Sequence, residues 1–302
     1  MPTKVRALLA VGLAFWAVAS SLASAAEEDA RPRERLYDLR YKFARGETVR
    51  SRVVHRATVE TTIQGTSQTA ETRTSSIKAW KVTAVSPSGN AHFIHSVESI
   101  DMWQHTHGRQ EVRYNSKTDK KVPPGYEDAA KAVGVPLTIV TIDKRGKVLK
   151  REEMHAQMPS STPIAFPLPT KAVPVGYVWT SPQDVDVLLK GGLTKKIATR
   201  QQFKLAKVDD GIATIEVDTQ VLTPVTDPAI EAQLIQRLTT GKYRFDISAG
   251  RMIDQQLDLD RRVIGFSGPS SSMHYVMRLT EELVPIVETQ TAEPSVPSVR
   301  RR

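Results

Sequence analysis

The stretch Tyr243-Arg244-Phe245-Asp246-Ile247-Ser248-Ala249-Gly250-Arg251 decides the fold class of this chain. Its apolar residues alternate with charged ones as far as Ile247, and a glycine-containing turn follows. A period of two places one row of side chains against a core and the other row toward water. A tight turn directly after such a run is typical of an antiparallel hairpin. The stretch therefore predicts a strand, a turn and a return strand.

The same alternation recurs along most of the chain. It is clear from Tyr37 to Phe43, from Val49 to Ile63 and from Ala213 to Val221. Turn signals separate these runs at Ser86-Pro87-Ser88-Gly89-Asn90, Lys144-Arg145-Gly146 and Asp209-Asp210-Gly211. Several runs would span more than about 30 Å as strands, so the sheet must twist or curl. We predict a mainly β (α+β minor) chain of two related antiparallel half-barrel-like sheets, each with one helix.

Two helices are expected. Asp227-Pro228 opens the first, with aspartate as N-cap and proline at the first helical position. Its apolar stripe is Ile230, Leu234, Ile235 and Leu238, and Gly241 is predicted to end it. The second is short and lies near Tyr126 to Val133.

The two halves of the chain resemble each other. Trp80 to Val85, a turn and Ala91 to Ile94 parallel Phe203 to Val208, a turn and Ile212 to Ile215. We predict a duplicated unit of about 120 residues, although any two antiparallel halves share such a pattern. The predicted divisions are a first β half at 27–157, a Pro-rich crossing segment at 158–174, a second β half at 175–284 and a disordered basic tail at 285–302.

Residues 1–26 are typical of a secretory signal peptide. Lys4 and Arg6 precede an apolar run from Ala7 to Ala19, and Ala23-Ser24-Ala25-Ala26 offers the small residues of a cleavage site. The alternative is an uncleaved anchor, but the run is shorter than the roughly 20 residues that span a bilayer. We expect an extracytoplasmic (periplasmic or secreted) protein with no transmembrane span after cleavage. The chain has no cysteine, so neither disulfides nor thiolate sites are possible.

The positive charge gives little support for a nucleic-acid partner. The formal net charge of +9 falls to +4 once Lys4, Arg6 and the arginines at 300–302 are set aside. The basic residues of the body are mixed with acidic ones, as on an ordinary solvated surface. We therefore expect no nucleic-acid partner.

Four motifs carry a resemblance to a known fold. They are Val112-Arg113-Tyr114-Asn115-Ser116, Thr141-Ile142-Asp143-Lys144-Arg145-Gly146-Lys147-Val148, Val175-Gly176-Tyr177-Val178-Trp179 and Tyr243 to Arg251. With them the chain resembles an uncharacterised family of secreted bacterial β proteins, similar in fold to the lipoprotein-carrier (LolA/LppX-like) half-barrel superfamily. The resemblance implies a curved sheet that cradles acyl chains, and it transfers no binding residue.

No motif predicts catalysis, a cofactor or a metal. The chain has no Gly-x-Ser-x-Gly, and Glu152-Glu153 and Glu281-Glu282 are neighbours on alternating faces. His105 and His107 would share one face of a strand and are weak metal candidates. Surface histidines beside the Gly108-Arg109 turn are the favoured explanation. We predict a protein that is not an enzyme, and leave a secreted hydrolase as the least favoured alternative.

Aromatic residues supply the binding hypothesis. If the concave side of the sheet is open, five of them would line an apolar groove: Trp80, Phe93, Trp103, Trp179 and Phe203. Core packing is the alternative for each. We predict a non-catalytic extracytoplasmic binding protein whose partner is a lipid, an acyl ligand or an envelope component. A structural or protein-interaction module of the cell envelope is the alternative.

Overall fold

The computed structural model describes residues 34–154, 164–189 and 191–285. The predicted signal peptide, the first part of the crossing segment and almost all of the tail lie outside the described residues. The chain divides into two compact units, Met1–Leu36 and Tyr37–Arg302. The strands and helices all lie within the second unit.

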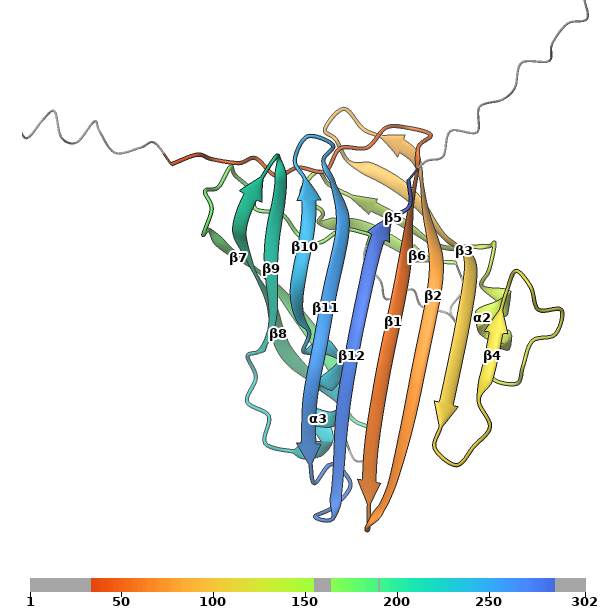
Figure 1. The fold of residues 1–302 in the computed structure, drawn as a ribbon. Helices are drawn as coiled ribbons and strands as arrows, with labels where there is room; N and C mark the ends of the chain where they lie inside the picture. Colours follow the sequence, from red (N-terminus) through yellow and green to blue (C-terminus); the bar gives the residue numbers. More distant parts are fainter. Residues whose placement is uncertain (1–33, 155–163, 190, 286–302) are drawn as a thin grey trace, which may run out of the picture. The chain divides into compact units, whose positions relative to one another are not determined.

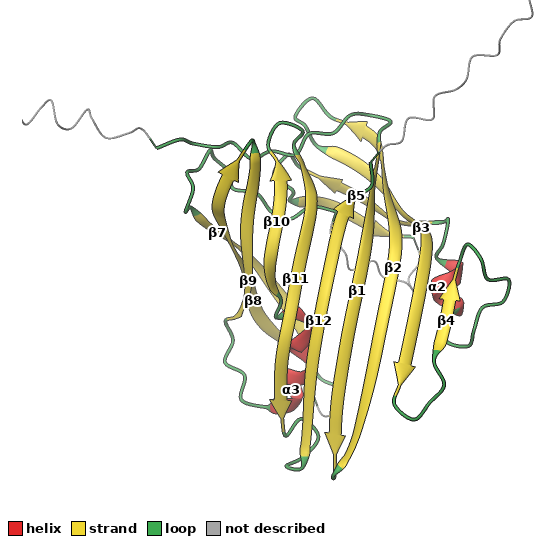
Figure 2. Ribbon diagram, viewed as in Figure 1, coloured by secondary structure: helices red, strands yellow, loops and turns green. Residues whose placement is uncertain are grey.

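The second unit is built on one twelve-stranded antiparallel sheet (Figures 1 and 2). Its strands are β1 Thr48–Ile63, β2 Thr66–Val85, β3 Ala91–Thr106, β4 Val112–Asn115, β5 Pro136–Ile142, β6 Val148–Glu153, β7 Val178–Leu188, β8 Thr194–Asp209, β9 Ile212–Val221, β10 Thr240–Asp246, β11 Arg251–Ile264 and β12 Ser271–Leu283. The prediction of a mainly antiparallel β chain is confirmed.

The two predicted halves meet edge to edge in this sheet. The strand order is β6-β5-β3-β2-β1-β12-β11-β10-β9-β8-β7, with β4 paired to β3. The first strand, β1, pairs along thirteen residues with the last strand, β12, from Ser51–Leu283 to Ile63–Ser271. Two separate sheets would each expose an extra edge of unpaired backbone groups, and this pairing removes both.

Both predicted helices form, but the end of the longer one differs from the prediction. α2 covers Glu127–Lys131, and α3 covers Pro228–Leu234 with the Asp227 carboxylate accepting from the Ala229 amide at 2.9 Å. A 3₁₀ turn, η1, follows at Ile235–Arg237. Across the described ranges, every helix falls short of the length and apolar character needed to cross a lipid bilayer.

Gly241 does not end the helix. It lies in β10, where a Cβ atom would stand 2.0 Å from the Gln256 carbonyl oxygen. Glycine is therefore required because β10 and β11 approach closely, and the sequence signal was mistaken for a C-cap.

One face of the sheet carries most of the buried side chains, and we call it the inner face. Trp80 and Phe93 from the first half share a core there with Phe203 and Phe245 from the second. The curl of the sheet brings these distant strands together. α3 and η1 cover another part of the inner face, where Ile235 packs with Leu259 and Val263.

Two extended segments fill this core. We call residues 37–43 the entry segment; the crossing segment is described from residue 164. The alternation from Tyr37 to Phe43 predicted a strand, but this stretch forms only an isolated bridge between Tyr37 and Val173. It still buries Leu39 and Tyr41, so the alternation marked the buried row correctly.

The β5–β6 turn holds the crossing segment in place. The Arg145 carbonyl accepts from the Leu168 amide at 2.8 Å, and the Tyr41 hydroxyl bonds both the carbonyl and the amide of Phe166 at 3.1 Å. Gly146 has φ +82°, and a Cβ there would stand 2.5 Å from the Phe166 carbonyl oxygen. The glycine of this turn thus provides room for the segment that crosses it.

The two halves repeat the same hydrogen bonds at their entries. The Gly46 amide donates to Val82 and the Val82 amide donates to Glu47, both at 2.9 Å. In the second half the Gly176 amide donates to Leu205 at 2.7 Å, and the Leu205 amide donates to Tyr177 at 3.0 Å. β1–β6 fall within the predicted first half and β7–β12 within the second.

Candidate functional site

A buried polar cluster interrupts the apolar inner face. Glu281 on β12 lies directly opposite Gln255 on β11, and Lys78 on β2 lies opposite Ser51 on β1. The Ser51 hydroxyl donates to Glu281 Oε1 at 2.5 Å, and Gln255 Nε2 donates to Oε2 at 2.7 Å. All four residues are buried. Both oxygens of the carboxylate are thus satisfied by neutral donors.

Lys78 is the exception in this cluster. Its side chain is 6% exposed, and its ammonium nitrogen has no hydrogen-bond partner in the described structure. Burial lowers the pKa of Lys78, and the nearby Glu281 carboxylate acts in the opposite direction. A buried ammonium without an acceptor is costly, so it is an unusual feature for a core. Such a group calls for an acceptor from a bound water, an ion, a ligand or a partner.

A small cavity of ≈ 30 Å³ lies beside the cluster. Ser51 and Glu281 line it, together with Trp80 and with Ile164 at the start of the described crossing segment. One water needs about 10–15 Å³ of such a cavity, so the space suits about two waters. Small-molecule sites usually measure about 300–1,000 Å³. A long acyl chain would therefore require the crossing segment to move.

The predicted groove residues divide between the two faces. Trp80, Phe93 and Phe203 are buried in the inner core, and Trp179 packs against Phe203 at 5.6 Å between ring centroids. Trp103 belongs to the opposite, outer face, where its indole nitrogen donates to Glu111 at 2.9 Å. Four of the five residues thus lie around the crossing segment, and the fifth is separated from them by the sheet.

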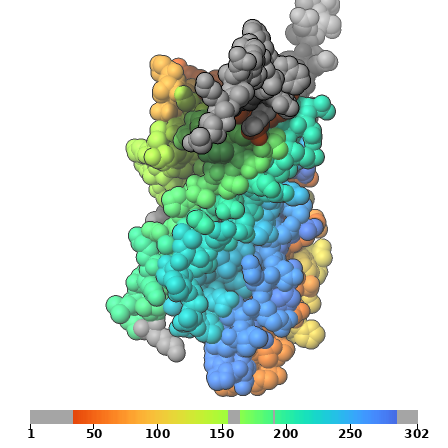
Figure 3. All heavy atoms as spheres, turned by 90° about the vertical axis from the view of Figure 1, so that its left-hand side faces the viewer, coloured from red at the N-terminus to blue at the C-terminus, as the bar shows by residue number. Residues whose placement is uncertain are grey.

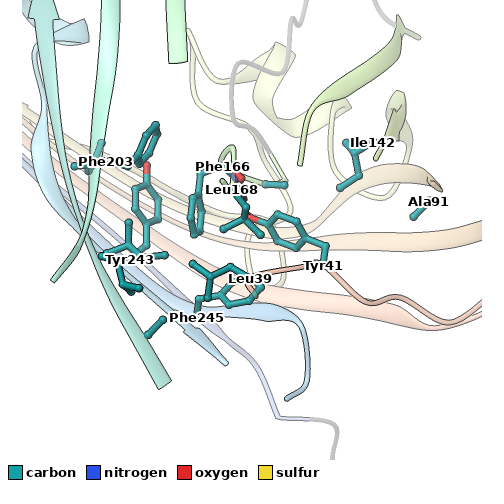
Figure 4. Packing of buried hydrophobic residues seen from close by; sticks show 14 of the residues in the cluster. Leu39, Tyr41, Ala91, Ile142, Phe166, Leu168, Phe203, Tyr243 and Phe245 are labelled. Atoms are coloured by element: carbon teal, nitrogen blue, oxygen red, sulfur yellow. Dashed lines mark hydrogen bonds between the residues drawn. The ribbon is translucent and has the colours of Figure 1, made fainter. Parts of the chain in front are cut away.

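The crossing segment packs against the aromatic residues that were predicted to line a ligand groove. Figure 4 shows the Phe166 ring between Tyr243 and Tyr41, and its centroid lies 4.3 Å from that of Tyr243 and 6.1 Å from that of Phe203. Burial raises the pKa of Tyr243, and the Glu281 carboxylate adds to this effect. The aromatic core and the polar cluster are therefore adjacent parts of one inner surface.

His95 also belongs to this inner surface. It is buried, and its ring stacks on Trp80 with centroids 4.1 Å apart. The pKa of His95 is lowered from 6.5 to about 4, chiefly by burial and also by the Lys78 and Arg151 cations, while the Glu153 carboxylate acts in the opposite direction. The histidine is therefore neutral in the folded protein at pH values where the unfolded chain already binds a proton.

Acidification should consequently destabilise the fold through His95. Since the folded-state pKa lies below the unfolded value, the contribution is complete above pH 6.5 and is lost as the pH falls toward 4. Between pH 7 and pH 5 we expect a loss of about 1–2 kcal/mol in the free energy of unfolding. Urea unfolding at both pH values would measure it. His95→Phe should remove most of this difference; an equal loss in variant and wild type would contradict the assignment.

The weak metal candidates do not converge on an ion site. His105 lies on β3 with Nδ1 3.7 Å from Glu71, and His107 follows the strand, with its amide donating to Thr69 at 2.8 Å. In the described part of the chain, no three His, Cys, Asp or Glu side chains are grouped so as to hold a metal.

The outer face carries two shallow depressions of about 800 Å³ each. They adjoin at Thr240 and Asp258 and are lined mainly by polar side chains. In the first depression Arg56 lies directly opposite both Arg73 and Arg278. Arg278 pairs with Asp258 at 2.6 Å. Like charges on facing residues destabilise a sheet, so this row of arginines is a second candidate for a functional site.

Sequence reasoning missed the inner polar cluster, although a signal was present. Glu281 shares its parity with Leu279 and Leu283, and Lys78 shares its parity with Trp80 and Val82. A charged residue in the apolar row of a strand must face the core. That parity could have identified both positions, but not that they lie on neighbouring parts of one sheet.

Comparisons with known proteins leave the family open. No protein-family model and no curated protein matches the chain. Among solved structures, the chain is similar to one described as lipid-protein interactions in lipovitellin, with a TM-score of 0.42 and 8% identity over 81% of this chain. It spans about a quarter (26%) of that chain.

A second similar structure is DynF from the dynemicin biosynthesis pathway of Micromonospora chersina. The TM-score is 0.23, with 7% identity over 85% of this chain and 88% of that one. At such TM-scores the chain is only loosely similar to either protein. Its function must be inferred from its own residues.

Proposed function

We propose that this protein is a non-catalytic extracytoplasmic binding protein for an amphiphile with one long apolar chain. The predicted signal peptide supports the location. The buried Lys78 ammonium carries the ligand assignment, because it offers hydrogen-bond donors and finds no acceptor among the residues that the structure describes. Glu281 already receives Ser51 and Gln255, so the cluster calls for a ligand that accepts. A carboxylate or ester head group has that chemistry.

The apolar chain of the ligand would take the place of the crossing segment. Phe166 and Leu168 are held over the inner face by main-chain bonds and by Tyr41, without a sheet ladder of their own. Displacing them would expose the aromatic surface of Trp80, Trp179 and Phe203 to an acyl chain. In the ligand-free state the segment covers that surface, so it acts as an internal substitute for the ligand.

Binding of cis-parinaric acid tests this proposal. Energy transfer from tryptophan to this fluorescent fatty acid should be saturable with the purified mature protein. Lys78→Met should weaken the affinity about 10–100-fold, because a hydrogen bond to a charged group is lost. Lys204→Met, which removes an exposed lysine from the outer face of β8, should leave the affinity unchanged.

Two results would count against this proposal. The first is the absence of saturable energy transfer. The second is equal affinity of wild type and Lys78→Met in a variant that still unfolds cooperatively.

A second candidate function is recognition of an anionic partner on the outer face. The facing arginines of the first depression and the half-buried Trp103 favour it. The same titration separates the two. If the acid binds there, Arg56→Ser with Arg73→Ser would lower its affinity, while Lys78→Met would not.

A further inference from the structure

The two ends of the sheet differ in what their turns expose. The β1–β2, β7–β8 and β11–β12 turns lie at one end, which we call the α3 end (Figure 1). The β2–β3, β5–β6, β8–β9 and β10–β11 turns lie at the other, which we call the opposite end. In Figure 3 the β11–β12 hairpin (blue) and the β1–β2 hairpin (orange) lie side by side at the lower end of the molecule.

The three most exposed large apolar side chains of the described residues all belong to the α3 end. Leu193 is 70% exposed, Ile264 is 68% exposed and Leu188 is 61% exposed. We call these three the tip residues. Ile63, at the end of β1, and Leu222, just after β9, add two more exposed aliphatic side chains at the same end.

The turns of the opposite end lack such residues within the described structure, although Val148 and Leu149 at the start of β6 and Val178 at the start of β7 are exposed nearby, at 44–49%. These turns span residues 86–90, 143–147, 210–211 and 247–250, and none of them carries an exposed large apolar side chain. They consist mostly of the small, polar and glycine residues that tight turns favour. The aliphatic character of the α3 end is therefore not a general property of the turns of this sheet.

α3 connects the two turns that carry the tip residues. The Gln233 side chain bonds both the amide and the carbonyl of Leu188 at 2.8 Å. At the other end of the helix, Pro228 lies beside Gly265, which follows Ile264: a Cβ atom at Gly265 would stand 3.7 Å from the Pro228 Cγ. Seven helical residues span roughly 10 Å, so the two turns are held close together. The contacts of α3 thus hold the turns that carry the tip residues in fixed positions.

We propose that the α3 end inserts its tip residues into the surface of a lipid bilayer. Aliphatic side chains on separate turns can enter the boundary between head groups and acyl chains one by one. A protein partner is less suited, because binding hot spots are rich in Trp, Tyr and Arg, and among the described residues no Trp, Tyr or Phe side chain is exposed. Exposed Lys195 and Arg261 lie close to the tip residues in the chain and would face anionic head groups.

Vesicle sedimentation tests this proposal. The purified mature protein should sediment with vesicles of phosphatidylcholine and phosphatidylglycerol. Replacing all three tip residues by serine should weaken vesicle binding at least about 100-fold, since each buried aliphatic side chain contributes about tenfold or more. The substitutions lie at exposed positions, so the variant should unfold at the wild-type temperature.

A matched variant controls for lost surface hydrophobicity. Val175→Ser, Val178→Ser and Val276→Ser remove three exposed aliphatic side chains away from the α3 end, and vesicle binding should persist. Lys78→Met should also bind vesicles normally, which separates this proposal from the ligand site. The proposal is overturned if the wild type does not sediment with vesicles, or if the two serine variants bind equally.

Discussion

Phe166→Ala should lower the free energy of unfolding by about 3–5 kcal/mol. The ring is buried and contacts Tyr243, Phe203, Phe245 and Tyr41 in one aromatic group. Its removal leaves a cavity that the main chain cannot close, because Tyr41 and the β5–β6 turn fix the backbone on both sides. Guanidinium unfolding followed by tryptophan fluorescence would measure the loss.

Phe166→Ala also tests the proposed ligand site. If the Phe166 ring occupies the place of an acyl chain, its removal should tighten binding of cis-parinaric acid while the fold becomes less stable. Val175→Ala, at a half-exposed position just after the crossing segment, is the control and should change stability by less than about 0.5 kcal/mol. A loss below about 1 kcal/mol for Phe166→Ala would show that the ring does not hold the two halves together.

Glu281→Leu should destabilise the protein by a similar amount, about 3–5 kcal/mol. The substitution keeps the approximate volume but leaves the Ser51 hydroxyl and the Gln255 amide without their acceptor. It also removes the carboxylate whose charge acts on the buried Lys78 ammonium. Breaking one side of a buried charge pair costs more than replacing both. Urea unfolding at pH 7 provides the measurement.

A double variant separates the effect of the unpaired Lys78 charge on stability from the effect of changed packing. Lys78→Met combined with Glu281→Leu should recover a substantial part of the lost stability, because no uncompensated charge is left inside. The neighbouring Glu282 is exposed, so Glu282→Leu should be nearly neutral. Additive effects of the two inner substitutions would mean that Lys78 and Glu281 do not interact.

Local pattern was enough to find the elements of this fold. The alternation around Phe245 and Val53 identified strands and the buried row on each, since side-chain direction repeats every two residues. Asp227-Pro228 identified the start of α3, because the cap and the first helical residue are set by neighbours in the sequence. Gly241 shows the limit of such reasoning, because its role depends on how closely β11 approaches.

The candidate site was only partly predictable. Trp80, Phe93 and Phe203 were expected together on one surface, and they do share a core. That Phe166 would cover them could not be read from a proline-rich stretch, because its path depends on bonds to Tyr41 and Arg145 from distant parts of the chain. The outer position of Trp103 could not be predicted either. The pairing of β2 with β3 shifts register opposite Ile77 and Lys78, and this shift places Trp103 on the outer face.

The β character and the order of the predicted strands and turns depend on residues close together in the chain, so they could be read from the amino-acid sequence. The pairing of β1 with β12 into one sheet, the covering of the inner face by the chain itself and the burial of Lys78 beside Glu281 became visible only in the folded protein. The reason is physical. Pairing between the two ends of a chain and burial of a charge are settled by the whole fold, in which backbone groups must find partners and apolar surface must be covered.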